Sequence, residues 1–285
     1  GAAPVATAAQ APFAAWGQGF GSWANEDGDS NVASADRTIG GFAVGIDRAV
    51  GGAARLGVLA GYSQSSVEVG GRNSSADVET ASVGAYGATR LGGFTLSGGG
   101  AYAWHATDMD RSVAFTGFTD SLSSDYDAHS VQLFAEAAYG IGLGRVRLEP
   151  FAGVAYVHLD TDGFTETGGA AALTSPGWTD DTTFTTVGLR GATDVRISSL
   201  AARLSGGIGW RHAFGDVDTQ VPLAFASGGS VFGVAGQAIA EDALVLDAGL
   251  DVAVGTRATL GLSYAGQIAD GVSDQGLRGS FTLRF

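Results

Sequence analysis

Hydrophobic side chains recur at every second residue along nearly the whole chain, yet no stretch approaches the ~20 consecutive apolar residues of a membrane-spanning helix. The last segment shows the pattern most clearly. Phe281, Leu283 and Phe285 lie on one face of an extended strand, and Arg278 and Arg284 lie on the other. A shift of one residue would place both arginines on the apolar face, so the register of this strand is strongly specified.

The same alternation repeats in twelve segments, most of them 10 to 15 residues long. Strands of soluble proteins average about 5–6 residues, whereas a tilted strand needs about 9–11 residues to cross the hydrocarbon of a membrane. The lengths therefore favour membrane strands over a soluble sandwich. The segments are residues 13–24, 38–47, 55–66, 77–90, 94–106, 127–140, 145–159, 181–194, 199–213, 242–254, 257–268 and 277–285.

The connections between these segments alternate between long and short, and charge follows the same division. Most carboxylates fall in or beside the long connections, near residues 25–37, 67–76, 107–126, 160–180, 214–241 and 269–274. Arginines gather at the short ones: Arg48, Arg55, Arg90, Arg145, Arg147, Arg196 and Arg257. Outer-membrane barrels have short periplasmic turns and longer external loops. We therefore expect an all-β fold, a transmembrane 12-stranded antiparallel up-and-down β-barrel over residues 13–285, with the N- and C-terminal ends of the chain on the periplasmic side.

Composition excludes several other classes of protein. The net charge is -14, so the chain is a poor binder of nucleic acid. The sequence contains no lysine and no cysteine, which removes P-loop and Schiff-base lysines, thiolate metal sites and cysteine nucleophiles. We expect no cofactor and no bound metal. Acidic pairs such as Asp160 with Asp162, or Asp180 with Asp181, could attract divalent cations, but ordinary surface charge is the favoured interpretation.

The inward face of the expected barrel carries small residues and a set of charges. We predict that these charges line a water-filled lumen, pair with one another, and contact any segment that passes through the pore. They are Glu136, Glu149, Arg190, Arg203, Arg211, Asp247 and Asp251. The outward aromatic residues near the strand ends should form girdles at the membrane interfaces. These are Tyr62, Tyr102, Trp104, Tyr139, Tyr156, Trp210 and Tyr264.

Several short segments, in this order and spacing, resemble the translocator β-domain of autotransporters, the type V secretion proteins of Gram-negative bacteria. The resemblance covers roughly residues 13 to 285. The segments that carry it are residues 16–23 (WGQGFGSW), 40–45 (GGFAVG), 59–62 (LAGY), 101–105 (AYAWH), 149–151 (EPF), 185–190 (TTVGLR), 209–212 (GWRH) and 281–285 (FTLRF).

The resemblance implies a non-catalytic outer-membrane barrel that anchors an N-terminal passenger and exports it to the cell surface, with a linker through the lumen. It implies that Phe281, Leu283 and Phe285 form the signal read by the outer-membrane β-barrel assembly machinery. The implied partners are outer-membrane lipid, the passenger and its linker, that machinery and periplasmic chaperones. Residues 1–12 would then be a truncated linker segment, since twelve helical residues reach about 18 Å, less than the ~25 Å apolar band. Extended, the segment could reach about 40 Å.

Two other functions remain open from the sequence. A passive diffusion channel would have the same barrel. A barrel hydrolase could use groups at the rim such as Asp108, Asp110, Asp127 and His129, although such residues are more often solvated. The four histidines form no HExxH motif, and no G-x-S-x-G sequence occurs. No asparagine precedes Asn25, so we expect no asparagine-dependent cleavage within this segment.

Overall fold

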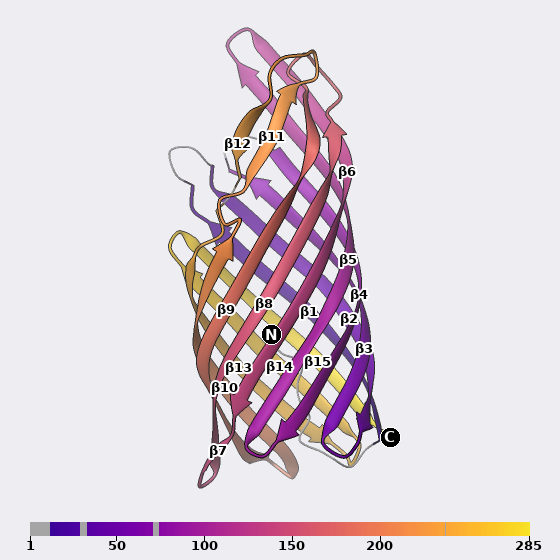
Figure 1. Cartoon of the computed structure of the whole chain (residues 1–285), viewed down its shortest axis with the longest axis vertical. Coiled ribbons are helices and arrows are strands. Elements are labelled where there is room, and N and C mark those ends of the chain that lie inside the picture. Colours follow the sequence, from indigo (N-terminus) through magenta and orange to yellow (C-terminus); the bar gives the residue numbers. More distant parts are fainter. Residues whose placement is uncertain (1–11, 29–32, 71–73, 237) are drawn as a thin grey trace.

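The computed structural model describes residues 12–28, 33–70, 74–236 and 238–285, which form a closed antiparallel β-barrel (Figure 1). Within these residues, no helix is long and apolar enough to cross a membrane. The barrel strands are β1 (Phe13–Glu26), β2 (Ala35–Val50), β3 (Ala54–Val69), β4 (Ser74–Leu91), β5 (Phe94–Phe115), β6 (Phe118–Tyr139), β8 (Val146–Thr165), β9 (Leu173–Ile197), β10 (Leu200–Gly215), β13 (Asp242–Val254), β14 (Ala258–Ala269) and β15 (Val272–Arg284). Three short strands accompany them: β7 (Ile141–Leu143), β11 (Gln220–Phe225) and β12 (Phe232–Ala235).

The first and last strands pair with each other and close the barrel. Each other barrel strand pairs with its predecessor and its successor, and β1 pairs with β15 from Ala14 opposite Arg284 to Glu26 opposite Val272. At the short-turn end the backbones of Phe13 and Phe285 exchange two hydrogen bonds of 3.0 Å, and their rings stack. Closure leaves no free edge among the barrel strands. The predicted 12-stranded barrel is confirmed.

Alternation along the strands separates an apolar outer wall from a polar inner one. On β2, Phe42, Val44 and Ile46 each remain about half exposed, because no other part of the protein covers them. Asp47 lies on the opposite face and bonds to Arg55 inside the barrel. An outer wall of exposed apolar side chains is the surface that lipid covers in a membrane barrel. The predicted girdle residues lie on this wall, but of the seven only Tyr139 stands at a strand end; the other six lie well inside strands that continue beyond them.

The long connections are more ordered than the sequence predicts. We expected residues 107–126 to be a connection, but β5 and β6 continue as a ladder to a turn at Gly117. Much of the expected connection 160–180 belongs to β8 and β9, and residues 214–241 include the hairpin of β11 and β12. Figure 1 shows these extensions at one end of the barrel, opposite the short turns. The prediction failed here because, beyond the membrane, both faces of a strand are polar and the hydrophobic period disappears.

The extension of β5, β6, β8 and β9 has a small packed core of its own. Leu122 is 2% exposed, and the rings of Tyr126 and Phe164 stack at 4.9 Å. The connection between β8 and β9 folds back onto β6, where Thr167 and Ser123 form a β-bridge. These contacts make the connection an ordered part of the wall.

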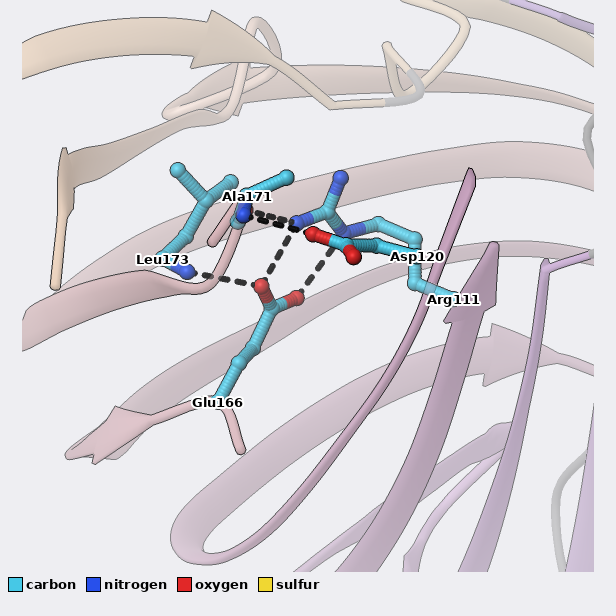
Figure 2. A network of polar contacts seen from close by, with 5 residues as sticks. All are labelled: Arg111, Asp120, Glu166, Ala171 and Leu173. Atoms are coloured by element: carbon cyan, nitrogen blue, oxygen red, sulfur yellow. Dashed lines mark hydrogen bonds and ion pairs between the residues drawn. The ribbon is translucent and has the colours of Figure 1, made fainter. Parts of the chain in front are cut away.

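An ion pair with a buried carboxylate fixes this connection in place (Figure 2). Arg111 donates from Nε and Nη2 to both carboxylate oxygens of Glu166, at 2.9 and 2.6 Å. The Glu166 side chain is only 2% exposed and also accepts the backbone N–H of Leu173 at 2.8 Å. Arg111 further donates to the carbonyl of Ala171, whose N–H donates to Asp120. The network thus joins β5, the start of β6 and the folded connection.

The expected linker segment 1–12 lies outside the described residues except for Pro12. The carbonyl of Pro12 accepts a hydrogen bond of 2.9 Å from the backbone N–H of Ala49. The chain therefore joins the barrel at the short-turn end of β2.

Candidate functional site

The lumen contains a cavity of about 1010 Å³ in the half of the barrel near the short turns. Among the described residues, its lining includes six arginines and three aspartates, so the charges that face it sum to a positive value. The arginines are Arg55, Arg145, Arg196, Arg203, Arg278 and Arg284, and the aspartates are Asp47, Asp194 and Asp251. Such a cavity favours water and anionic groups over cations.

Two of the predicted lumen residues, Arg203 and Asp251, line this cavity. They lie opposite each other on β10 and β13, and Asp194 lies opposite Arg203 on the other side, on β9. Arg203 Nε donates to Asp194 at 2.9 Å. Asp251 leans over Gly261, where a Cβ would lie 2.6 Å from its carboxylate oxygen. The glycine therefore leaves the space that this carboxylate occupies.

Three more predicted residues meet nearer the middle of the lumen. Arg190 forms an ion pair with Glu136, and its guanidinium lies 4.2 Å from the centre of the Phe151 ring. A Cβ on Gly207 would overlap the carboxylate of Asp247 and lie 2.9 Å from Arg190 Cγ. Arg190 is therefore placed between two carboxylates and an aromatic face.

Glu149 and Arg211 do not join that group. Glu149 lies opposite Arg190 in the β8–β9 register, but its ion pair is with Arg147, at 3.1 Å. Arg211 lies toward the long connections, with its guanidinium 5.3 Å from the centre of the Phe184 ring. The inward charges thus form separate clusters at several levels of the barrel.

Sequence reasoning missed a further cluster, in which an inward tryptophan is central. Trp16 Nε1 donates to the hydroxyl of Tyr86 at 2.5 Å, and that hydroxyl donates to Asp47 at 2.9 Å. Arg55 Nε donates to the same aspartate at 2.6 Å. Trp16 lies over Gly45, which leaves room for its ring. The signal was hidden because β1 places glycines on the outer face and large side chains on the inner one.

The predicted assembly-signal residues lie on the outer wall of the last strand. Phe281, Leu283 and Phe285 are each exposed, and Phe285 stacks on Phe13 across the closing seam. Their backbone ends the ladder at the short-turn end.

The rim groups considered for hydrolysis lie on the outer wall, among other acids. Asp108 stands in register between Asp77 on β4 and Asp125 on β6, four residues beyond the girdle residue Trp104. A hydrogen bond with Asp125 raises the pKa of Asp108 above its ordinary value, and the charges of Asp125 and Glu79 add to this. Within the described residues, no group of three or more His, Cys, Asp or Glu side chains could hold a metal ion.

We expect the Asp108→Asn variant to stabilise the extension of β5 and β6 at neutral pH. A raised pKa means that protonation stabilises the folded extension below the ordinary carboxyl pKa of 3.8, and that this stabilisation is lost as the pH rises. Hydrogen–deuterium exchange of residues 105–127, corrected for intrinsic rates, measures the effect. In wild type these amides should be better protected in acid than at neutral pH. In Asp108→Asn the protection at the two pH values should be nearly the same. Equal protection of both proteins at neutral pH would contradict the expectation.

The comparisons with known proteins agree with this architecture. A family model described as the autotransporter beta-domain matches residues 15–265. Two Serratia marcescens proteins titled "Extracellular serine protease" are 35% identical over 271 residues, which cover 95% of this chain and 26% of each relative. The chain therefore spans about a quarter of the length of the curated relatives it matches.

Two solved structures share the fold. The translocator domain of autotransporter NalP from Neisseria meningitidis has a TM-score of 0.78 at 17% identity, covering 96% of this chain and 88% of that chain. The beta domain of the Bordetella autotransporter Brka has a TM-score of 0.72 at 20% identity, covering 96% of this chain and all of that one. With the matched family model, these findings identify the chain as a member of the autotransporter beta-domain family, an outer-membrane translocator barrel for a passenger.

Proposed function

We propose that this chain exports its own N-terminal passenger through the lumen, with the long connections outside the cell and the first and last residues of the barrel, Phe13 and Phe285, at the periplasm. The single observation that carries this proposal is that Phe13 and Phe285 meet at the short-turn end, beside the cavity. A passenger that precedes Phe13 then has its attachment at the periplasmic mouth and must cross the lumen to reach the surface. The chain itself contributes no catalytic group in this proposal.

The inward charges suit contact with a segment that passes through the pore. Arg190 and Arg203 each hold a carboxylate of the wall, yet they keep 27% and 38% of their side-chain surface exposed, so a passing chain could exchange for those partners. Phe281, Leu283 and Phe285 present an apolar, outward-facing end strand, which suits recognition by the assembly machinery before closure. Periplasmic chaperones would hold the same apolar faces before insertion.

The test is surface display of a tagged passenger fused ahead of residue 1. In cells where the barrel shows heat-modifiable gel mobility, and is therefore folded, protease added outside should remove the tag. A folded barrel with a tag that resists external protease would refute export. Proteolysis at the long connections, from outside intact cells, checks the orientation separately.

We expect Arg190→Ala to alter passenger display or pore conductance by about fivefold while leaving membrane insertion unchanged. Removal of the guanidinium takes the cation away from Glu136 and from beside Asp247. A partly hydrated ion pair contributes about 1 kcal/mol of interaction free energy, which corresponds to this factor. The double variant Glu136→Gln/Arg190→Gln, which keeps the pair neutral, is the control. Glu149→Ala tests the prediction that Glu149 also contacts a segment that passes through the pore. Unchanged display and conductance in both single variants would show that these residues only line the wall.

A passive diffusion channel is the second candidate, because the positive cavity of about 1010 Å³ could pass small anions. Reversal potentials in planar bilayers distinguish the two functions when read with the display assay. A steady anion-selective current without export would favour the channel.

A further inference from the structure

Three of the four histidines lie on the outer wall, and each has an aspartate opposite it on the next strand. His158 faces Asp181 across β8 and β9, and His212 faces Asp242 across β10 and β13. His129 lies opposite Asp160 across β6 and β8. The fourth, His105, faces the lumen, where it bonds to Thr80 and Ser130.

Two of these pairs have the same geometry, although they come from different strands. In each, the histidine Nδ1 lies 2.8 Å from the aspartate Oδ1. In each, the same oxygen also accepts from an aromatic residue two positions earlier on the histidine strand: the hydroxyl of Tyr156 in one pair, and Nε1 of Trp210 at 2.9 Å in the other. We call these two His–Asp pairs, His158–Asp181 and His212–Asp242, the interfacial pairs.

The interfacial pairs lie at the rim of the apolar wall. Toward the short turns, their strands carry the exposed apolar residues Val154, Val187 and Ile208. The aromatic members are girdle residues of the kind that sits at the level of lipid headgroups. Asp181 and Asp242 keep 50% and 62% of their side-chain surface exposed. The interfacial pairs therefore face the headgroup layer rather than the hydrocarbon.

The chemistry of a His–Asp pair depends on how many protons the imidazole ring carries. An ionised aspartate can only accept, so Nδ1 of each histidine donates to it and Nε2 is left for other partners. When the ring takes up a second proton, Nε2–H becomes a cationic donor, the kind of group that binds phosphate. While the ring is neutral, a His–Asp pair presents a net negative charge.

No lysine or arginine faces either histidine from the adjoining strands, within the residues described. The groups around His158 are Asp181 on β9, His129 and Val131 on β6, and Tyr156 and Asp160 on its own strand. Those around His212 are Asp242 on β13, Thr185 on β9, and Trp210 and Phe214 on its own strand. Among the described residues that adjoin these two pairs, histidine is thus the side chain that can become a cation.

We propose that the interfacial pairs form a pH-dependent binding surface for the phosphate groups of outer-leaflet glycolipid. Protonated His158 and His212 donate from Nε2 to phosphate while Asp181 and Asp242 hold the rings in position. At higher pH the carboxylates repel the same phosphates. The inference rests on the proposed orientation, in which the long-connection rim meets the outer leaflet. It needs no passenger, so it can fail or hold independently of export.

The test measures the affinity of the purified barrel for fluorescent lipid A in a non-ionic detergent with EDTA, at about pH 5.5 and about pH 8, on either side of the ordinary histidine range. EDTA removes bridging divalent cations. Other carboxylates and the phosphates also titrate. Each variant is therefore judged by the ratio of its affinity at about pH 5.5 to its affinity at about pH 8. Wild type should bind more tightly in acid. His158→Gln/His212→Gln should lower that ratio about fivefold, as expected for the loss of exposed charge contacts.

His105→Gln is the matched control, because it removes a histidine that faces the lumen, and it should keep the wild-type ratio. Asp181→Asn/Asp242→Asn should bind lipid A more tightly than wild type at about pH 8, since the repelling carboxylates are gone; a merely structural role for the pairs would not give this gain. A ratio unchanged by His158→Gln/His212→Gln, or lowered equally by His105→Gln, would overturn the proposal. So would the absence of binding to lipid A by the folded wild-type barrel.

Discussion

Replacement of Arg111 by alanine will open the connection between β8 and β9 and increase its cleavage by elastase roughly hundredfold. Glu166 is almost fully buried, and Arg111 is the cation that neutralises it. Removal of one partner of a buried pair costs about 3–5 kcal/mol, because the other charge is left uncompensated, and the lower value corresponds to this factor. The connection leaves its site so that Glu166 regains water. Elastase cleaves after small residues, and Ala170, Ala171 and Ala172 provide its sites.

The matched control is Arg37→Ala, which breaks an ion pair whose carboxylate is not buried. Arg37 and Asp274 lie 3.2 Å apart and keep about a third of their side-chain surface in solvent. Exposed pairs contribute about 0–1 kcal/mol, so this variant should change cleavage by less than about fivefold. Glu166→Gln should fall between the two, since it keeps an acceptor for the Leu173 N–H but loses the charge. If Arg37→Ala and Arg111→Ala had equal effects, burial would not be the reason for the order of this connection.

The sequence predicted the membrane-spanning part of the barrel because lipid imposes a strict period on it. Phe42, Val44 and Ile46 must all face outward, and that requirement is written in every second residue. Arg111 and Glu166 are 55 residues apart and lie beyond the apolar band, where no period links them. Their pairing depends on how β5 and the folded connection meet in space, so it could not be read from the chain.

The lumen was predictable in part for the same reason. Side chains alternate between the two faces of a strand, and this alternation alone placed Glu136, Arg190 and Asp247 on the inner wall. The alternation does not tell which strands face each other across the barrel, or which glycines leave space for a neighbouring side chain. The meeting of Arg190 and Asp247 over Gly207 depends on both. Trp16 was missed because it reverses the rule and places a large apolar ring inside, where Tyr86 and Asp47 satisfy its polar edge.

The division between the two walls predicts opposite results for adjacent residues of β6. Leu133 is 51% exposed on the outer wall, about midway between the girdle residue Tyr139 and His129 at the far rim. Gln132, its neighbour, faces the lumen. Leu133→Arg should lower the free energy of unfolding from a bilayer by about 2–4 kcal/mol, the cost of arginine on the lipid face near the midplane. Gln132→Arg introduces the same side chain into water and should change it by no more than about 0.5 kcal/mol.

Reversible unfolding in guanidinium chloride with lipid vesicles measures both values, and Leu133→Ala separates the loss of the leucine from the gain of the charge. The contrast between Leu133→Arg and Gln132→Arg is the critical result, because both variants introduce arginine on the same strand and at nearly the same depth. Once the loss of the leucine is subtracted, the medium that the arginine enters is the difference between them. Equal losses for the two arginine variants would mean that the inner wall is as dry as the outer one. A lumen of that kind could not present hydrated charges such as Arg190 and Glu136 to a passing chain.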